Sequence, residues 1–291
     1  MDRRRIYETL LRRLGEPPFV NQTGHAAQVE DLRQAILAIR SRLTPRGLEE
    51  ARAVYLEATA AAPDDYYLHA DFAKLEEDVG NFAEAASQWQ TARDEIPFAP
   101  GPHYYLGKVL GALGKTNAAL RELTEALALR PDLAEALDEK GRLLTKSGRA
   151  EEGLRNFEKA AELEPENARI QIGKAEALAT LGRRAEAVRQ LELAVRTQPG
   201  FWEAHYLLGI ELALQGEFRP AQEQFAEAAR LNPNYPLAHL NLGIALAKLN
   251  QPEQAMNQFQ ETLRLDPQNQ KAAKYLEALK TDLSRRQQVP R

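Results

Sequence analysis

Four histidines recur at a regular spacing and are the residues best suited to acid–base chemistry or metal binding. His69 and His103 are 34 residues apart, as are His205 and His239. An imidazole can serve as a general base or as a metal ligand near neutral pH. However, no His-Glu-x-x-His pair accompanies them, and the chain has no cysteine. The regular spacing therefore predicts that these histidines pack inside a repeated structure.

A second candidate for chemistry is the run Gly114, Lys115 and Thr116, which resembles the end of a phosphate-binding loop. That loop requires another glycine five residues before the last one, and a preceding strand. Val109 occupies the first place and the flanking pattern is helical. Paired-glycine dinucleotide turns and Gly-x-Ser-x-Gly are also absent from the sequence. We therefore expect no catalytic residue, no cofactor and no metal: the sequence predicts a protein that is not an enzyme.

Composition and charge further limit the class of protein and the partners it can bind. The 291 residues are 44% hydrophobic and 27% charged, and the net charge is −4. Residues 63–270 hold 22 basic and 32 acidic side chains, a difference of −10, which argues against nucleic acid as a partner. No apolar run approaches the roughly 18 residues that a membrane span needs, and no secretory signal is recognised. The expected location is the cytoplasm, or the periplasm if the sequence was excised from a longer chain.

One spacing organises most of the chain. Seven prolines are each 34 residues apart: Pro63, Pro97, Pro131, Pro165, Pro199, Pro233 and Pro267. If these prolines take position 32 of a 34-residue unit, position 15 holds a residue that tolerates a left-handed backbone: Gly80, Gly114, Gly148, Gly182, Gly216 and Asn250. Each unit is therefore predicted to be a helix, a glycine turn and a second helix that ends before proline.

Small and large side chains alternate within the unit at helical spacing. Position 8 is usually glycine or alanine, and positions 20 and 27 are almost always alanine. Large apolar side chains occupy positions 7, 11 and 24, as in Leu208, Leu212 and Phe225. This alternation predicts two helices that approach closely at the small residues.

The 34-residue period, with its small residues and its proline, resembles the tetratricopeptide repeat. The resemblance implies an all-α, right-handed α-solenoid of about seven repeats. We expect an N-terminal helix and proline-containing arm at 1–31 and a degenerate first repeat at 32–65, with its turn at Thr44–Gly47. Six clear repeats should follow at 66–267, and a C-terminal capping helix and tail at 268–291.

In this family the first helix of each repeat lines a concave groove, and the resemblance implies that an extended peptide or partner segment binds there. The predicted groove has a basic, tyrosine-lined half and an apolar half, suited to a ligand with acidic and hydrophobic ends. Its expected residues are Tyr67, Lys74, Tyr104, Lys108, Arg142, Lys146, Ile172, Tyr206, Ile210, Leu240 and Ile244. Leu214 and Leu237 extend the apolar half.

Several alternatives stay open. Acidic residues of the basic half could neutralise its cations within the protein: Glu77, Asp78, Glu135 and Asp138. The N-terminal arm could fill the groove with Phe19 and Val20. The arm also resembles the junction before repeats on bacterial sulfatase-like or alkaline-phosphatase-like enzymes, so the chain could be an accessory module of a larger enzyme or envelope assembly. Residues 75–80 with Trp89 resemble the half-a-tetratricopeptide variant of RNA-processing scaffolds.

Overall fold

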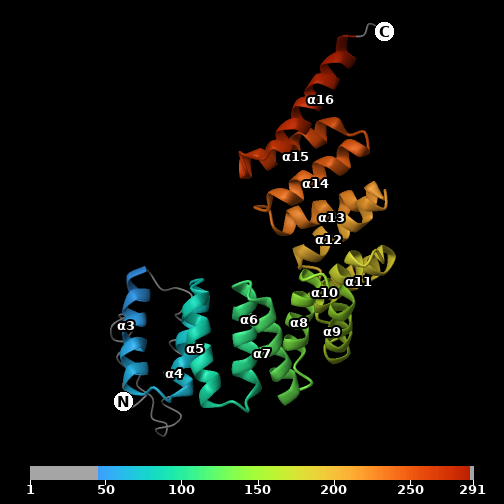
Figure 1. Ribbon diagram of the computed structural model, residues 1–291. Helices are drawn as coiled ribbons and strands as arrows, with labels where there is room; N and C mark the ends of the chain where they lie inside the picture. The colour runs from blue at the N-terminus through green and yellow to red at the C-terminus, as the bar shows by residue number, and fades with distance from the viewer. Residues whose placement is uncertain (1–44, 289–291) are drawn as a thin grey trace, which may run out of the picture. The chain divides into compact units, whose positions relative to one another are not determined.

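The computed structural model describes residues 45–288, and all regular structure in that range is α-helical. The expected all-α fold is therefore confirmed. The described part contains the following helices: α3 (Pro45–Ala61), α4 (Tyr66–Asp78), α5 (Phe82–Glu95), α6 (Pro100–Ala112), α7 (Thr116–Leu129), α8 (Ala134–Lys146), α9 (Ala150–Leu163), α10 (Ala168–Thr180), α11 (Arg184–Thr197), α12 (Trp202–Leu214), α13 (Phe218–Leu231), α14 (Pro236–Lys248), α15 (Pro252–Leu265) and α16 (Gln270–Gln288) (Figure 1). The predicted N-terminal helix and arm, including Phe19 and Val20, lie outside the described residues.

The helices pack in pairs that follow the 34-residue period. Within pairs, α4 packs against α5, α6 against α7, α10 against α11, α12 against α13, and α14 against α15. Successive pairs then contact each other through α5 and α6, α9 and α10, α11 and α12, and α13 and α14, while α16 packs on α15. Most of these contacts join neighbours in the sequence, and the first helices α10, α12 and α14 also contact one another in order, as expected of a helical repeat array.

The chain divides into two compact units, residues 1–139 and 140–291, and α8 crosses the boundary. We call them unit 1 and unit 2. The described part of unit 1 holds α3 to α7, and unit 2 holds α9 to α16. Each unit has its own packed interior.

The turn inside each pair is built on the left-handed residue predicted at position 15. Gly80, for example, has φ 76°, and Asn250 has φ 57°. The amide of Asn81 donates to the carbonyl of Glu76 at 2.8 Å, and the amide of Gly80 donates to that of Glu77 at 3.0 Å. These two bonds form a Schellman motif, which satisfies carbonyl groups left over at the helix end. The predicted turn is confirmed at all six positions.

Prolines mark the helix boundaries as predicted. The second helix of each pair ends two residues before the periodic proline, as α7 does before Pro131. Pro100, Pro236 and Pro252 occupy the first turns of α6, α14 and α15, where a missing N–H breaks no helical bond. The degenerate first repeat differs from prediction: Pro45 to Gly47 belong to α3, which begins three residues earlier in the repeat register than its counterparts.

Glycine at position 8 lets the paired helices approach closely. A Cβ added to Gly209 would lie 2.7 Å from the ring of Phe225, and one added to Gly243 would lie 2.6 Å from the ring of Phe259. Real Cβ atoms do not come so near an aromatic carbon. The sequence signal of a small residue at position 8 opposite a large one at position 24 therefore has a direct steric cause.

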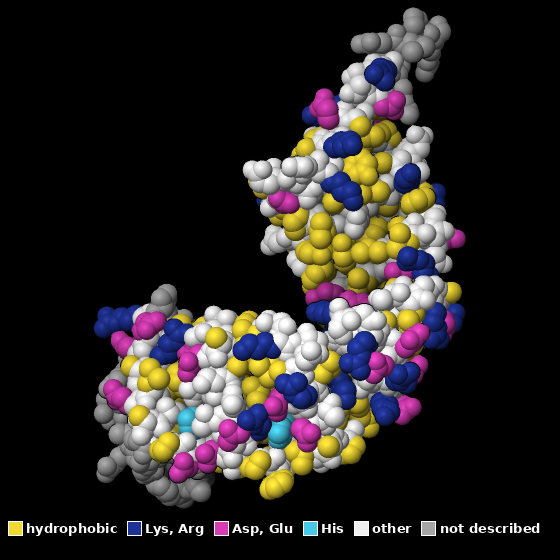
Figure 2. Space-filling model, viewed as in Figure 1, with side chains coloured by type: hydrophobic (Ala, Val, Ile, Leu, Met, Phe, Trp, Pro, Cys, Tyr) yellow, Lys and Arg dark blue, Asp and Glu magenta, His cyan; other side chains and the backbone are white. Residues whose placement is uncertain are grey.

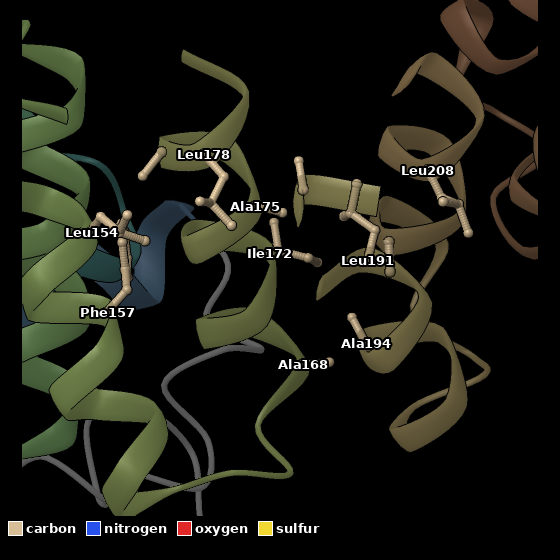
Figure 3. Close-up of a cluster of buried hydrophobic side chains, with 12 residues drawn as sticks. Leu154, Phe157, Ala168, Ile172, Ala175, Leu178, Leu191, Ala194 and Leu208 are labelled. Atoms are coloured by element: carbon tan, nitrogen blue, oxygen red, sulfur yellow. The ribbon is translucent and has the colours of Figure 1, made fainter. Parts of the chain in front are cut away.

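Apolar side chains from successive pairs fill the interior of unit 2. One cluster takes Leu154 and Phe157 from α9, Ile172 and Leu178 from α10, and Leu191 from α11 (Figure 3). All five are at least 95% buried. Because the cluster joins neighbouring helix pairs, burial of this apolar surface is what holds one repeat to the next.

Candidate functional site

The periodic histidines bind the backbone between repeats, which explains their spacing. The Nε2 atom of His69 lies 2.8 Å from the carbonyl oxygen of Pro63, and its Nδ1 lies 2.7 Å from Oε1 of Gln88. His103, His205 and His239 contact the same two positions, a proline carbonyl six residues back and a side chain nineteen residues on, which is glutamate for His103 and glutamine for the other two. The first three histidines are also buried. The prediction that these histidines pack inside the repeat is confirmed, although the sequence did not reveal their hydrogen bonds to proline carbonyls.

The run at Gly114 is a helix turn. Gly114 has φ 72° and donates its amide to the carbonyl of Gly111, while Lys115 donates its amide to that of Leu110. Helices α6 and α7 flank the run. Among residues 45–288, no group of three or more histidine or acidic side chains is arranged to hold a metal ion.

In unit 1, the predicted lysines and tyrosines lie on α4 and α6, and Tyr105 contacts two of them. The Nζ atom of Lys74 lies 5.3 Å above the ring of Tyr105, at a distance typical of a cation–π contact. Tyr104 packs beside Tyr105, with 4.9 Å between ring centroids. Tyr67 is 43% exposed. Aromatic and cationic groups therefore share this surface.

Glu77 neutralises part of the same surface. Its Oε2 accepts a hydrogen bond from Nζ of Lys108 at 3.0 Å, and its Oε1 accepts one from Nε1 of the buried Trp89 at 2.7 Å. The indole thereby orients the carboxylate toward the lysine. At Lys108, the structure therefore contains the alternative in which an acidic residue of the protein neutralises the cation.

The remaining predicted cations, Arg142 and Lys146, belong to unit 2. Arg142 donates from Nη2 to the carbonyl of Arg169 at 2.9 Å, and its Nη1 lies 3.9 Å from Oε2 of Glu176. Its side chain is 19% exposed, whereas Lys146 is exposed. The guanidinium is thus turned partly toward the next helix pair rather than fully toward solvent.

The predicted apolar residues of unit 2 divide into a buried group and a surface group. Ile172 and Leu240 are 5% and 4% exposed and pack within the interior clusters. They leave almost no side-chain area for a ligand. The surface group, which we call the apolar surface, consists of Tyr206, Ile210, Leu214, Leu237 and Ile244 on α12 and α14.

The apolar surface is uncovered by the rest of unit 2. Leu214 is 60% exposed and Leu237 is 40% exposed. Ile210 and Ile244 are half-buried against the cluster below them. Figure 2 shows hydrophobic side chains gathered over the region that α12 to α14 form.

Tyr206 adds a polar group to the apolar surface without adding charge. Its hydroxyl accepts a hydrogen bond from Nδ2 of Asn241 at 3.2 Å, and its ring meets that of Tyr235 edge-on at 5.1 Å. Burial, together with the nearby Tyr235, raises the pKa of Tyr206 to about 12. The phenol therefore stays protonated and neutral at physiological pH.

Two residues of α16 that continue the repeat register of the apolar surface were not predicted as site residues. Lys271 and Lys274 stand at positions 2 and 5 of α16, the same positions as Leu237 and Leu240 on α14. Both lysines are exposed. The sequence assigns them only to the polar side of a capping helix, but continuing the repeat register past Pro267 would have placed them in the row of candidate site residues.

None of the helices in the described range is long and apolar enough to cross a membrane. None of the curated proteins compared with the chain matches it. Two family models do match, at residues 144–209 and 206–270, and both are described as the tetratricopeptide repeat.

Solved structures share the arrangement of helices. YrrB, a tetratricopeptide repeat protein described as having an unusual peptide-binding site, is 24% identical, with a TM-score of 0.52 over 65% of this chain and 97% of its own. TTC0263, a thermophilic repeat protein of Thermus thermophilus, is 25% identical, with a TM-score of 0.51 over 62% and 99%. A repeat protein of Parabacteroides merdae is 15% identical, with a TM-score of 0.66 over 94% and 99%.

The matched models begin in α8 and end at the start of α16, and the same proline and glycine positions continue through α4 to α7, which the models do not reach. One repeated structure therefore accounts for the described helices on both sides of the unit boundary. The chain is therefore a tetratricopeptide repeat protein, and the family's models match its residues 144–270.

Proposed function

We propose that the protein is a non-catalytic scaffold that binds an extended segment of a partner protein on the first helices of its repeats. Tetratricopeptide repeats typically mediate protein–protein interactions. The observation that carries the proposal is the apolar surface, where Leu214 and Leu237 expose 60% and 40% of their area. Exposed apolar clusters of this kind on a folded protein are typical of partner-binding sites.

The rigidity of the surface supports the proposal. Ile210 and Ile244 rest on a packed interior cluster, and Tyr206 is held by Asn241 and Tyr235. A partner therefore meets side chains that are already ordered, so that little conformational entropy is lost on binding. YrrB, which shares the fold, is described as having a peptide-binding site.

The lysine- and tyrosine-bearing surface of unit 1 provides a second binding place. Tyr67, Lys74, Tyr104 and Lys108 suit acidic and aromatic groups of a partner. Glu77 lowers the positive charge available there, because it already pairs with Lys108. We therefore assign the main binding energy to the apolar surface of unit 2, and a smaller share to unit 1, Arg142 and Lys146.

The test compares two single substitutions in unit 2. Leu214→Asp places a charge on the apolar surface, whereas Leu163→Asp places one at a 44%-exposed leucine at the end of α9, a second helix of its pair. Proteins captured from the native lysate by each variant are quantified against the unmodified chain, with circular dichroism as the folding control. Leu214→Asp should reduce capture of the main partner at least about tenfold, since burying an unpaired carboxylate is costly.

Leu163→Asp should leave capture unchanged. Equal capture by both variants would place binding on another surface and contradict the proposal. A loss of capture with both variants, accompanied by normal helicity, would also contradict it.

A further inference from the structure

We propose that the segment bound on unit 2 carries aliphatic side chains with carboxylates at one end, and that Lys271 and Lys274 of α16 bind those carboxylates. This inference rests on the proposed function, because it names the chemistry of the ligand for the apolar surface. It treats α16 as part of the binding surface as well as a cap on the last repeat.

The repeat register places these lysines next to the apolar surface. Helices α12, α14 and α16 begin at Trp202, Pro236 and Gln270, 34 residues apart each time. α12 contacts α14, and α16 packs on α15, the partner helix of α14. Position 2 therefore forms a row that runs from α12 through Leu237 to Lys271, and position 5 forms a parallel row that ends at Lys274.

Helix α16 is held firmly enough to present the two ammonium groups. The ring of Tyr275 stacks on that of Phe259 in α15, with 5.4 Å between centroids and 14° between planes. Ala272 and Leu276 are buried in the same cluster that supports the apolar surface. The backbone beneath the lysines is thus fixed to the last pair, while their side chains extend into solvent.

Both lysines are available to a ligand. Their side chains are exposed, and within residues 45–288 neither ammonium group lies within ion-pair distance of a carboxylate. Lys108 of unit 1 shows the contrasting case, in which Glu77 already occupies the cation at 3.0 Å. Carboxylates of a ligand on unit 2 therefore need not displace a partner from these lysines.

The charges at the two ends of the surface also set the direction of the ligand. Glu203 occupies position 2 of α12, at the end of the apolar surface farther from α16 in the repeat register. Oε2 of Glu203 is buried and accepts no hydrogen bond from the described residues. Carboxylates of a ligand are repelled at that end and attracted at the α16 end, because opposite charges lower the energy and like charges raise it.

The apolar surface between these ends carries no charge on its own residues. Tyr206 remains a neutral phenol, and the other four residues are aliphatic. A charged ligand group over α12 and α14 would lose water without gaining a partner, which is unfavourable. The ligand that fits is therefore aliphatic over α12 and α14 and acidic over α16.

The test selects ligands without assuming a sequence. A phage-displayed library of random dodecapeptides is selected on the full chain, and the enriched peptides are synthesised with a fluorescent label for anisotropy titrations. We expect peptides in which Leu, Ile, Val or Phe is followed or preceded, always on one side, by Asp or Glu. Titrations then compare Lys271→Glu/Lys274→Glu with a matched control, Lys280→Glu/Arg285→Glu, which reverses two exposed charges elsewhere on α16.

Reversal at Lys271 and Lys274 should weaken an enriched acidic peptide by about tenfold, since each exposed ion pair contributes a modest factor and like charges then repel. It should also strengthen a version of the peptide with lysines in place of its acids. The control pair should change affinity less than about twofold. Equal weakening by both pairs, or enrichment of aliphatic peptides with no acidic residues, would overturn the inference.

Failure of the proposed function has a different signature. Leu214→Asp would then leave the affinity of the enriched peptides unchanged, or the selection would enrich no aliphatic peptide at all. If Leu214→Asp abolishes binding while the lysine reversal has no effect, the apolar site stands and the role of α16 is refuted.

Discussion

In unit 1 the first helices α4 and α6 present lysines and tyrosines, whereas in unit 2 the first helices α12 and α14 present aliphatic side chains. On the lysine- and tyrosine-bearing surface of unit 1, side chains bind one another: Lys108 pairs with Glu77, and Lys74 lies over Tyr105. On the apolar surface, by contrast, Leu214 and Leu237 remain 60% and 40% exposed. The contrast indicates that unit 1 satisfies much of its surface within the protein, while unit 2 leaves its surface to a partner.

Beneath these surfaces the scaffold is the same. Leu123 in unit 1 and Phe225 in unit 2 occupy position 24, are 0% and 2% exposed, and contact the glycine at position 8 of their pair. Position 24 thus serves packing in both units, and the first-helix positions vary independently of it. Stability and binding can therefore be altered separately.

The largest expected effect tests that common scaffold. Leu123→Ala should lower the free energy of unfolding by about 2–5 kcal/mol and Phe225→Ala by about 3–5 kcal/mol, because each leaves a cavity in a packed interior. Urea denaturation followed by circular dichroism measures both values. A loss below about 1 kcal/mol in either unit would mean that this unit lacks the tight core that the comparison assumes.

Alkaline titration tests how far the phenol of Tyr206 is buried in unit 2. Its pKa in the folded protein, about 12, lies above the ordinary value of 10, so folding favours the protonated phenol. This contribution is fully present below pH 10 and is lost as the pH rises from 10 to 12, because the unfolded chain ionises first. Between those pH values, the unmodified protein should lose more stability than Tyr206→Phe.

Urea midpoints of both proteins at about pH 8, 10 and 11 provide the measurement. Tyr67→Phe, at a 43%-exposed tyrosine of unit 1, is the matched control for the loss of a phenol hydroxyl. If Tyr206→Phe shows the same loss as the unmodified protein, the phenol is more hydrated than its contacts with Tyr235 and Asn241 indicate.

Much of the fold follows from the sequence because its signals are local. A left-handed residue at position 15, a proline at position 32 and small residues at 8 and 20 determine turns, helix ends and close approaches one repeat at a time. The exception is α3, where Pro45 begins the helix early and the turn expected through Gly47 does not form. A proline in the first turn of a helix favours the start of a helix, and at Pro45 this preference outweighs the turn signal of Gly47.

The candidate site is predicted less well from the sequence, because it depends on packing between repeats. Tyr206 and Leu240 share position 5, yet the tyrosine extends to the surface while the leucine is 4% exposed in the interior cluster. The length of the side chain decides whether it reaches the surface, and the repeat position alone does not predict this. The contact between Glu77 and Lys108, 31 residues apart, likewise depends on Trp89 orienting the carboxylate.

The smallest expected effect tests whether Glu77 sets the character of unit 1. Glu77→Gln keeps an oxygen that can accept from Nε1 of Trp89 but removes the charge that pairs with Lys108. The free energy of unfolding should fall by less than about 1 kcal/mol, because the lysine side chain is 46% exposed. Affinity for a labelled tetraglutamate probe at low ionic strength should rise about two- to threefold, since the nearby cations are then less neutralised.

Asp94→Asn removes one negative charge from α5, where Asp94 pairs with Arg93 and its side chain is 59% exposed, and it serves as the control. Fluorescence anisotropy of the probe should show no rise for this variant beyond that expected from net charge. An equal rise with both variants would mean that Glu77 has no local role. The difference between the two surfaces would then lie in their residue composition alone, and not in the internal pairing that distinguishes Lys108 from Lys271 and Lys274.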